Sequence, residues 1–129
     1  MHKTTNCVAQ FRYGKYNFLS VMADNKALSG LRVLEYSDFI AGPYCAKLLG
    51  DLGAEVIKIE KPNLGDDSRL HGPFPQDIPH PEKSGLFLYL NANKLGITLD
   101  VESATGATIL KELLKNADIF IEDKPSAEM

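Results

Sequence analysis

Groups that could bind a small anion follow two apolar segments of this sequence: charged side chains after one and a Gly-Pro turn after the other. Lys61 comes directly after an apolar segment, and an Asp-Asp-Ser-Arg run follows it at residues 66–69. A Gly-Pro turn at residues 42–43 follows an earlier apolar segment and offers backbone N–H groups. Ligands of open parallel sheets bind where strands reach their carboxyl ends. The pattern therefore predicts a ligand site whose basic residues could hold a phosphorylated molecule.

The same residues also have plainer interpretations. Lys61 taken alone is typical of a solvated surface lysine, and Gly42-Pro43 alone is typical of a helix start. Arg69 is expected to form a local ion pair with Asp66 or Asp67 that stiffens the loop. The two aspartates are expected to form a solvated turn rather than a Mg²⁺ site.

Other chemistries find little support. His71 and His80 stand nine residues apart in a Pro-rich segment without a neighbouring Cys, which argues against a metal site. Cys45 is expected to be a small buried apolar residue of the first helix, and no base is marked that could make it a nucleophile. The glycine fingerprint of dinucleotide sites is absent, since Gly50 and Gly53 fall at the end of a helix, where the dipole repels phosphate. NAD binding is therefore disfavoured.

Composition sets the general class. The chain has 129 residues, 44% of them hydrophobic and 24% charged, with a net charge of −3. This composition is that of an ordinary globular protein and argues against nucleic acid as a partner. Two cysteines suggest neither a disulfide framework nor a metal site, and a cytoplasmic location fits best. No apolar run is long enough to span a membrane. Residues 1–27 are expected to be a flexible extension before a domain at 28–129.

The elements that must position these residues alternate between strand and helix. Residues 31–36 predict a strand, and a helix starts near Pro43 with an apolar stripe of Tyr44, Leu48, Leu49 and Leu52. Gly53 is expected to end this helix in a left-handed conformation. A second strand follows at 54–59, so that the unit is a right-handed βαβ with parallel strands.

The second half continues the alternation after a long loop. Five of the seven prolines fall within residues 61–84, which predicts a surface loop. Residues 86–90 are ambiguous between strand and helix. Downstream we expect a turn at 91–94, a strand at 96–101, a helix at 102–115 that buries Ala107, Leu110, Leu113 and Leu114, and a strand at 118–121.

Four segments, taken together, resemble the N-terminal part of the family III (CaiB/BaiF-like) CoA-transferases, which include formyl-CoA transferase, carnitine CoA-transferase and α-methylacyl-CoA racemase. They are LSGLRVLEYSDFIAGP, LGDLGAEVIKIEKP, GDDSR, and NANKLGITLDV with the later ADIFIED. Their order and spacing agree from residue 28 to about residue 123. The resemblance implies a Rossmann-like α/β fold, an open and mainly parallel sheet with flanking helices, here as the N-terminal portion of a larger domain.

The resemblance also implies a function and a set of binding positions. A catalytic Asp of the transferases exchanges CoA between carboxylic acids through an aspartyl-CoA thioester, and on the family's pattern it lies beyond this chain. No catalytic residue or metal ligand is therefore expected here, and CoA or acyl-CoA is a substrate rather than a tightly bound cofactor. The implied CoA-binding positions are Ile40, Ala41, Lys61, Leu99, Asp100, Val101, Glu102, Asp123, Lys124 and Pro125.

The resemblance implies a different contact with CoA for each group of positions. Ile40 and Ala41 belong to the turn that approaches CoA, and Lys61 stands where the family often places an Arg on the phosphates. Residues 99–102 match the segment along the adenine, with Glu102 where the family often has Lys. Residues 123–125 match the region beside the pantetheine arm, with Asp123 where Asn is usual.

Three interpretations stay open. The chain is an inactive N-terminal fragment of a transferase or racemase, one half of a split enzyme completed by a C-terminal polypeptide, or a binding module without catalysis. The expected partners are acyl-CoA, a carboxylic acid acceptor, and either a second copy or the complementing polypeptide.

Overall fold

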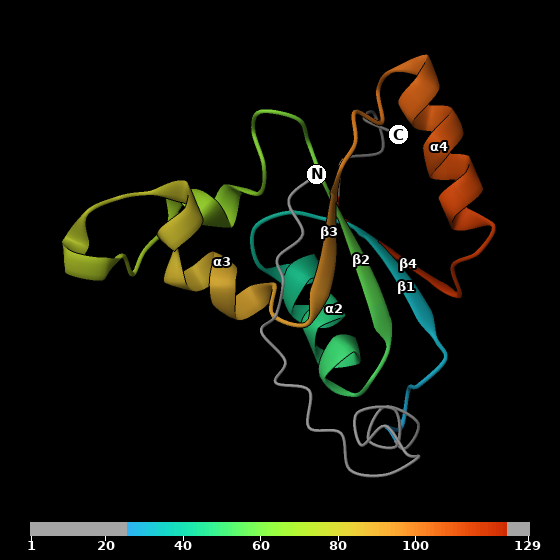
Figure 1. Cartoon of the computed structure of the whole chain (residues 1–129), viewed down its shortest axis with the longest axis horizontal. Coiled ribbons are helices and arrows are strands. Elements are labelled where there is room, and N and C mark those ends of the chain that lie inside the picture. Colours follow the sequence, from blue (N-terminus) through green and yellow to red (C-terminus); the bar gives the residue numbers. More distant parts are fainter. Residues whose placement is uncertain (1–25, 124–129) are drawn as a thin grey trace, which may run out of the picture.

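A computed structural model describes residues 26–123 of the chain. Within them, four parallel strands form one sheet in the order β3-β2-β1-β4. The strands are β1 (Arg32–Tyr36), β2 (Glu55–Glu60), β3 (Lys94–Thr98) and β4 (Ile119–Glu122). Helices α2 (Ala41–Asp51), α3 (Gly85–Leu90) and α4 (Ala104–Leu114) connect them. The predicted α/β class with a parallel sheet and flanking helices is confirmed (Figure 1).

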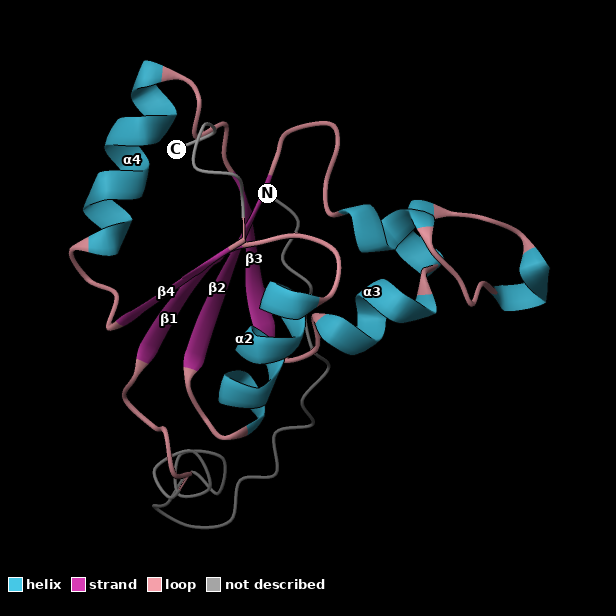
Figure 2. Cartoon of the chain, turned by 180° about the vertical axis from the view of Figure 1, so that it is seen from behind, coloured by secondary structure: helices cyan, strands magenta, loops and turns pink. Residues whose placement is uncertain are grey.

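The sheet separates two hydrophobic clusters, because successive side chains of a strand point to opposite faces. Val33 and Val56 pack with Ala46 of α2 on one face. Leu34 and Ile59 pack on the other face, where Leu110, Leu113 and Leu114 of α4 contact them. Helices α2 and α4 therefore lie on opposite sides of the sheet (Figure 2). The predicted apolar side of α4 is confirmed for its three leucines.

Helix α2 buries a different face from the one its sequence predicts. Gly42, Pro43, Ala46 and Gly50 are buried, whereas three residues of the expected apolar stripe, Tyr44, Leu48 and Leu52, are exposed. Small residues let this helix lie close to the sheet, and a Cβ at Gly50 would stand 3.3 Å from Val56 Cγ2. Only Leu49 of the predicted stripe packs against the core.

The ends of the helices follow local signals. Helix α2 begins two residues before Pro43, and Gly53 beyond its end takes the expected positive φ of 107°. The side chains of Ser84 and Ser103 accept N–H bonds at the starts of α3 and α4. Strand β3 is two to three residues earlier than predicted, because its ladder with β2 runs from Lys94 to Thr98. The ambiguous segment at 86–90 is helical.

Residues 61–84 are more ordered than a plain surface loop. Three short 3-10 helices occur there, η1 (Asp67–Leu70), η2 (Pro75–Asp77) and η3 (Pro81–Lys83). Asp66, Ser68 and Ser84 are buried, while the Pro-rich part between them is exposed as predicted. Figure 1 shows that this segment and α3 extend away from the side of the sheet. In the part of the chain that the structure describes, no helix could cross a membrane.

Candidate functional site

The predicted binding residues that the structure describes all follow the carboxyl ends of strands. Ile40 and Ala41 follow β1, Lys61 follows β2, and Asp123 follows β4. Residues 99–102 follow β3. Because the four strands are parallel, these positions share one edge of the sheet. Lys124 and Pro125 lie outside the described residues.

The turn after β1 and the end of β4 meet where the strand order reverses. The chain moves from β1 to β2 and β3 on one side and then returns to place β4 on the other side of β1. Such a reversal opens a crevice in which α/β sheets bind ligands. Asp38 N–H donates to both carboxylate oxygens of Asp123, at 3.0 and 3.2 Å. The structure thus brings Asp123 beside the turn that carries Ile40 and Ala41.

A second group forms where β2 and β3 end. Lys61 Nζ lies 3.0 Å from Glu102 Oε1, although the two residues are far apart in sequence. The backbone N–H of Leu99 bonds to Glu60 O at 3.0 Å, and Glu102 N–H bonds to Asp100 Oδ1 at 3.2 Å. Leu99 and Val101 pack into the cluster under α4. Asp100 and Glu102 are the exposed members of this segment.

A shallow cleft lies between the two groups. It is lined by the last residues of β1 and β2 and by the loops that follow them: Tyr36, Ser37, Asp38, Ile59, Glu60, Lys61, Gly65 and Asp66. Lys61 is on its wall, and Asp38 links it to Asp123. Of the predicted binding residues, Lys61 therefore lines the cleft itself, and Asp123 is bonded to a residue of its wall.

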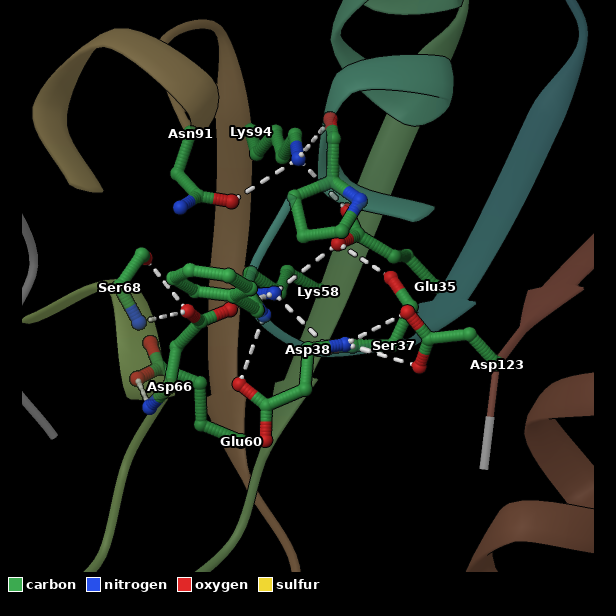
Figure 3. A network of polar contacts seen from close by, with 12 residues as sticks. Glu35, Ser37, Asp38, Lys58, Glu60, Asp66, Ser68, Asn91, Lys94 and Asp123 are labelled. Atoms are coloured by element: carbon green, nitrogen blue, oxygen red, sulfur yellow. Dashed lines mark hydrogen bonds and ion pairs between the residues drawn. The ribbon is translucent and has the colours of Figure 1, made fainter. Parts of the chain in front are cut away.

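Four charged side chains are buried beneath this edge, in the order Lys94, Glu35, Lys58, Asp66 (Figure 3). Lys94 Nζ lies 2.8 Å from Glu35 Oε2, and Lys58 Nζ lies 2.9 Å from Glu35 Oε1. Lys58 Nζ also lies 2.6 Å from Asp66 Oδ2. All four side chains are at most 2% exposed. Two positive and two negative groups alternate, so the buried charge is balanced, as burial requires.

These four residues, called here the buried charge chain, connect the elements around the cleft. Lys94 of β3 donates to Pro43 O in α2 at 2.8 Å and to Asn91 Oδ1 at 2.9 Å. Lys58 of β2 donates to Ser37 O at 3.1 Å. Asp66 accepts the N–H of Ser68 at 2.8 Å, at the start of η1. The turn after β1, the start of α2 and the loop after β2 are thus fixed to one another.

The two buried lysines differ in their number of anionic partners. Burial lowers the pKa of Lys58, but Glu35 and Asp66 outweigh this effect and hold its pKa above 10.5. Burial also lowers the pKa of Lys94, and its bond to Glu35 offsets this only partly, so that its pKa lies below 10.5. The positive charge of Lys58 adds to that decrease. The carboxylate of Glu35, which Lys94 shares with Lys58, thus does not offset the effect of burial on the pKa of Lys94.

Arg69 binds partners other than the predicted ones. Its guanidinium makes two bonds to Glu60, at 2.8 and 3.0 Å, and a third to Glu82 at 3.2 Å. It also lies 3.5 Å from the centre of the Phe87 ring. The expected pair with Asp66 or Asp67 is wrong, because Asp66 turns inward to Lys58. Arg69 therefore joins the end of β2 to η3 and α3.

Two further expectations are corrected. Cys45 is exposed rather than buried, because α2 turns its small residues toward the sheet. The expected solvated turn at Asp66-Asp67 is wrong for Asp66, which is 2% exposed. Among residues 26–123, no group of three or more His, Cys, Asp or Glu side chains is placed to hold a metal ion.

Sequence reasoning missed the buried charge chain, although a signal for it exists. Glu35 lies two residues after the buried Val33 on β1, and Lys58 lies two residues after the buried Val56 on β2. Residues two apart on a strand share a face. Opposite charges at such positions of two central strands therefore indicate a buried ion pair.

Comparison with known proteins gives a consistent result. Residues 28–129 match the family model described as CoA-transferase family III. An (R)-2-hydroxy-4-methylpentanoate CoA-transferase of Clostridioides difficile is 47% identical over 94 residues, which are 73% of this chain and 23% of that protein. A formyl-CoA:oxalate CoA-transferase of Bradyrhizobium diazoefficiens is 44% identical over 98 residues, 76% of this chain and 22% of that protein.

A solved structure agrees with these sequence matches. The crystal structure of a CaiB/BaiF family protein from Brucella suis aligns with a TM-score of 0.66 and 37% identity. The alignment covers 76% of this chain and 26% of that one. The chain thus spans about a quarter of the length of the relatives it matches.

Proposed function

This chain belongs to CoA-transferase family III, and we propose that residues 28–129 form the part of an acyl-CoA transferase that holds the CoA portion of the substrate. The reaction would move CoA between two carboxylic acids through an aspartyl-CoA thioester. The aspartate would come from a part of the enzyme outside this chain. The described residues would then bind and orient CoA without forming the covalent intermediate.

The convergence of the predicted residues carries this proposal. Ile40, Ala41 and Asp123 meet at the reversal of strand order, while Lys61 and Glu102 meet at the ends of β2 and β3. An extended ligand with phosphates at one end and a flexible arm at the other could contact both groups along one edge. Lys61 would bind phosphate as a point charge. Lys124 and Pro125 are proposed to contribute beside the arm, and Asp100 beside the adenine.

Transfer is proposed in preference to racemisation because the matched relatives named above are CoA-transferases. A racemase-type fragment and a non-catalytic CoA-binding module are the alternatives. We propose acyl-CoA and a carboxylic acid as substrates. The proposed protein partner is either a second copy of the chain or a complementing C-terminal polypeptide, and only the latter would supply the aspartate. A cytoplasmic location is proposed as well, where both substrates would be dissolved.

Calorimetric titration of the 129-residue chain with CoA and with NAD tests the binding function. We expect saturable heat with CoA and none with NAD. Lys61→Met should weaken CoA binding, whereas Lys115→Met, on the exposed end of α4, should leave it unchanged. An assay of CoA exchange between two acids should show no turnover by the chain alone. Absence of CoA binding at millimolar concentration would overturn the proposal.

A further inference from the structure

The pair between Lys61 and Glu102 places an anion where the proposed ligand would put its phosphate. Lys61 Nζ and Glu102 Oε1 are 3.0 Å apart, within the range of a charge-assisted hydrogen bond. The Lys61 side chain is 29% exposed and the Glu102 side chain is 60% exposed. A dissolved anion can therefore reach the pair, and Glu102 can move away into solvent.

The position of Glu102 is set by its neighbours. Its N–H bonds to Asp100 Oδ1, and the next residue, Ser103, caps α4 through Gly106 N–H. The backbone of residue 102 is thus held between a turn and a helix start. Its carboxylate therefore stays within reach of Lys61, although the exposed side chain itself can turn into solvent.

Other cations near the cleft have carboxylate partners as well. Lys58 is neutralised by Glu35 and Asp66 inside the sheet. Arg69 is bound to Glu60 and Glu82. An incoming phosphate would thus meet basic groups that already have acidic partners. Glu102 is the exposed partner that faces Lys61, the proposed phosphate-binding residue.

We propose that Glu102 is an internal counterion of the phosphate subsite, which holds the Lys61 side chain in place and competes with the phosphate groups of the ligand. This inference rests on the proposed binding function. It adds Glu102 as a residue that sets the affinity of the site for CoA. Exposed ion pairs contribute little stability, so that a phosphate can displace Glu102 at small cost. The remaining carboxylate still repels the bound phosphate. Both effects weaken the binding of the phosphorylated ligand, and salt, which screens the charge of Glu102, reduces this loss of affinity.

The test compares CoA with pantetheine, which lacks the phosphates, on the intact chain and on Glu102→Gln. Glutamine keeps the size of the side chain and removes its charge. We expect Glu102→Gln to bind CoA about three- to tenfold more tightly at low salt, a gain that decreases at high salt. Pantetheine affinity should not change. Glu112→Gln is the matched control, because the Glu112 side chain is similarly exposed (63% against 60%) and pairs with Lys115, and it should leave both affinities unchanged.

The outcomes separate the two proposals. Equal CoA affinity of the intact chain and Glu102→Gln would overturn the role of Glu102 and leave the binding function standing. A gain that extends equally to pantetheine would also overturn it, because it would indicate a change of loop structure rather than competition for phosphate. Absence of CoA binding by every variant would overturn the proposed function and this inference with it.

Discussion

Glu35 and Lys58 occupy paired positions of β1 and β2, and their charged atoms lie 2.9 Å apart in the interior of the sheet. Each is extended by a further partner, Lys94 for Glu35 and Asp66 for Lys58. The pair thus connects neighbouring strands with the loop that covers them. Two residues that contact Lys58, Ser37 and Asp66, line the cleft.

Removal of the Lys58 charge should lower the free energy of unfolding. Lys58→Met would leave Asp66 and part of Glu35 buried without a cation, and uncompensated buried charges cost about 3–5 kcal/mol. Lys115→Met is the matched control, because Lys115 forms an exposed pair whose loss costs about 0–1 kcal/mol. Urea denaturation followed by circular dichroism measures both free energies of unfolding. Similar losses for the two variants would contradict the buried charge chain.

The two buried lysines should titrate in a fixed order. Lys94, whose pKa is lowered by burial, should lose its proton before Lys58, whose pKa is raised by its two carboxylates. NMR of the lysine Cε–Hε groups between pH 8 and 12 measures this order. Glu35→Gln should lower both pKa values and Lys94 should respond more, since Asp66 still faces Lys58. A Lys94 that titrates with or after Lys58 would refute the assignment.

The same shifts fix the sign of the pH dependence of stability. The raised pKa of Lys58 means that its contribution is complete below pH 10.5 and is lost as the pH rises through its native pKa. For Lys94 the native pKa is lowered, so the unfolded state binds more protons between that pKa and 10.5. Across that window the Lys94 contribution to stability increases with pH.

Gly42 should not tolerate a side chain. A Cβ there would stand 2.2 Å from Ser37 Cβ, so Gly42→Ala would force the start of α2 away from β1. Overpacking of this kind costs about 1–3 kcal/mol and should also weaken CoA binding at the adjacent turn. Gly96→Ala is the control, because no atom lies within 4 Å of a Cβ there. Thermal unfolding and calorimetry compare the variants, and equal behaviour would contradict the close packing at Gly42.

Much of the fold can be predicted from local patterns in the sequence. The Gly-Pro turn, the positive-φ Gly53 and the apolar strands predict a parallel βαβ unit, and the structure confirms it. These signals are local because turns and strand alternation depend on a few neighbouring residues. The family was also recognisable from four short segments in order.

For helix α2 the sequence pattern predicts the wrong buried face, because the distance between the helix and the sheet decides which side chains fit. Tyr44, Leu48 and Leu52 form an apolar stripe that periodicity assigns to the core, yet α2 turns Gly42, Ala46 and Gly50 inward. Periodicity reports which residues share a face, but it does not report how close a helix lies to the sheet. The small face is the buried one because only small side chains fit at this distance: a Cβ would stand 2.2 Å from Ser37 Cβ at Gly42 and 3.3 Å from Val56 Cγ2 at Gly50.

The sequence by itself determined the class of fold, the family, and the ends of β1, β2 and β4 to within one residue, but it placed the end of β3 three residues too late. Only the tertiary structure decided the partners of the charges: Lys58 with Glu35 and Asp66, Arg69 with Glu60, and Lys61 with Glu102. The reason is physical. Ion pairs depend on distances of a few ångströms between side chains that are remote in sequence, and strand order and register set those distances.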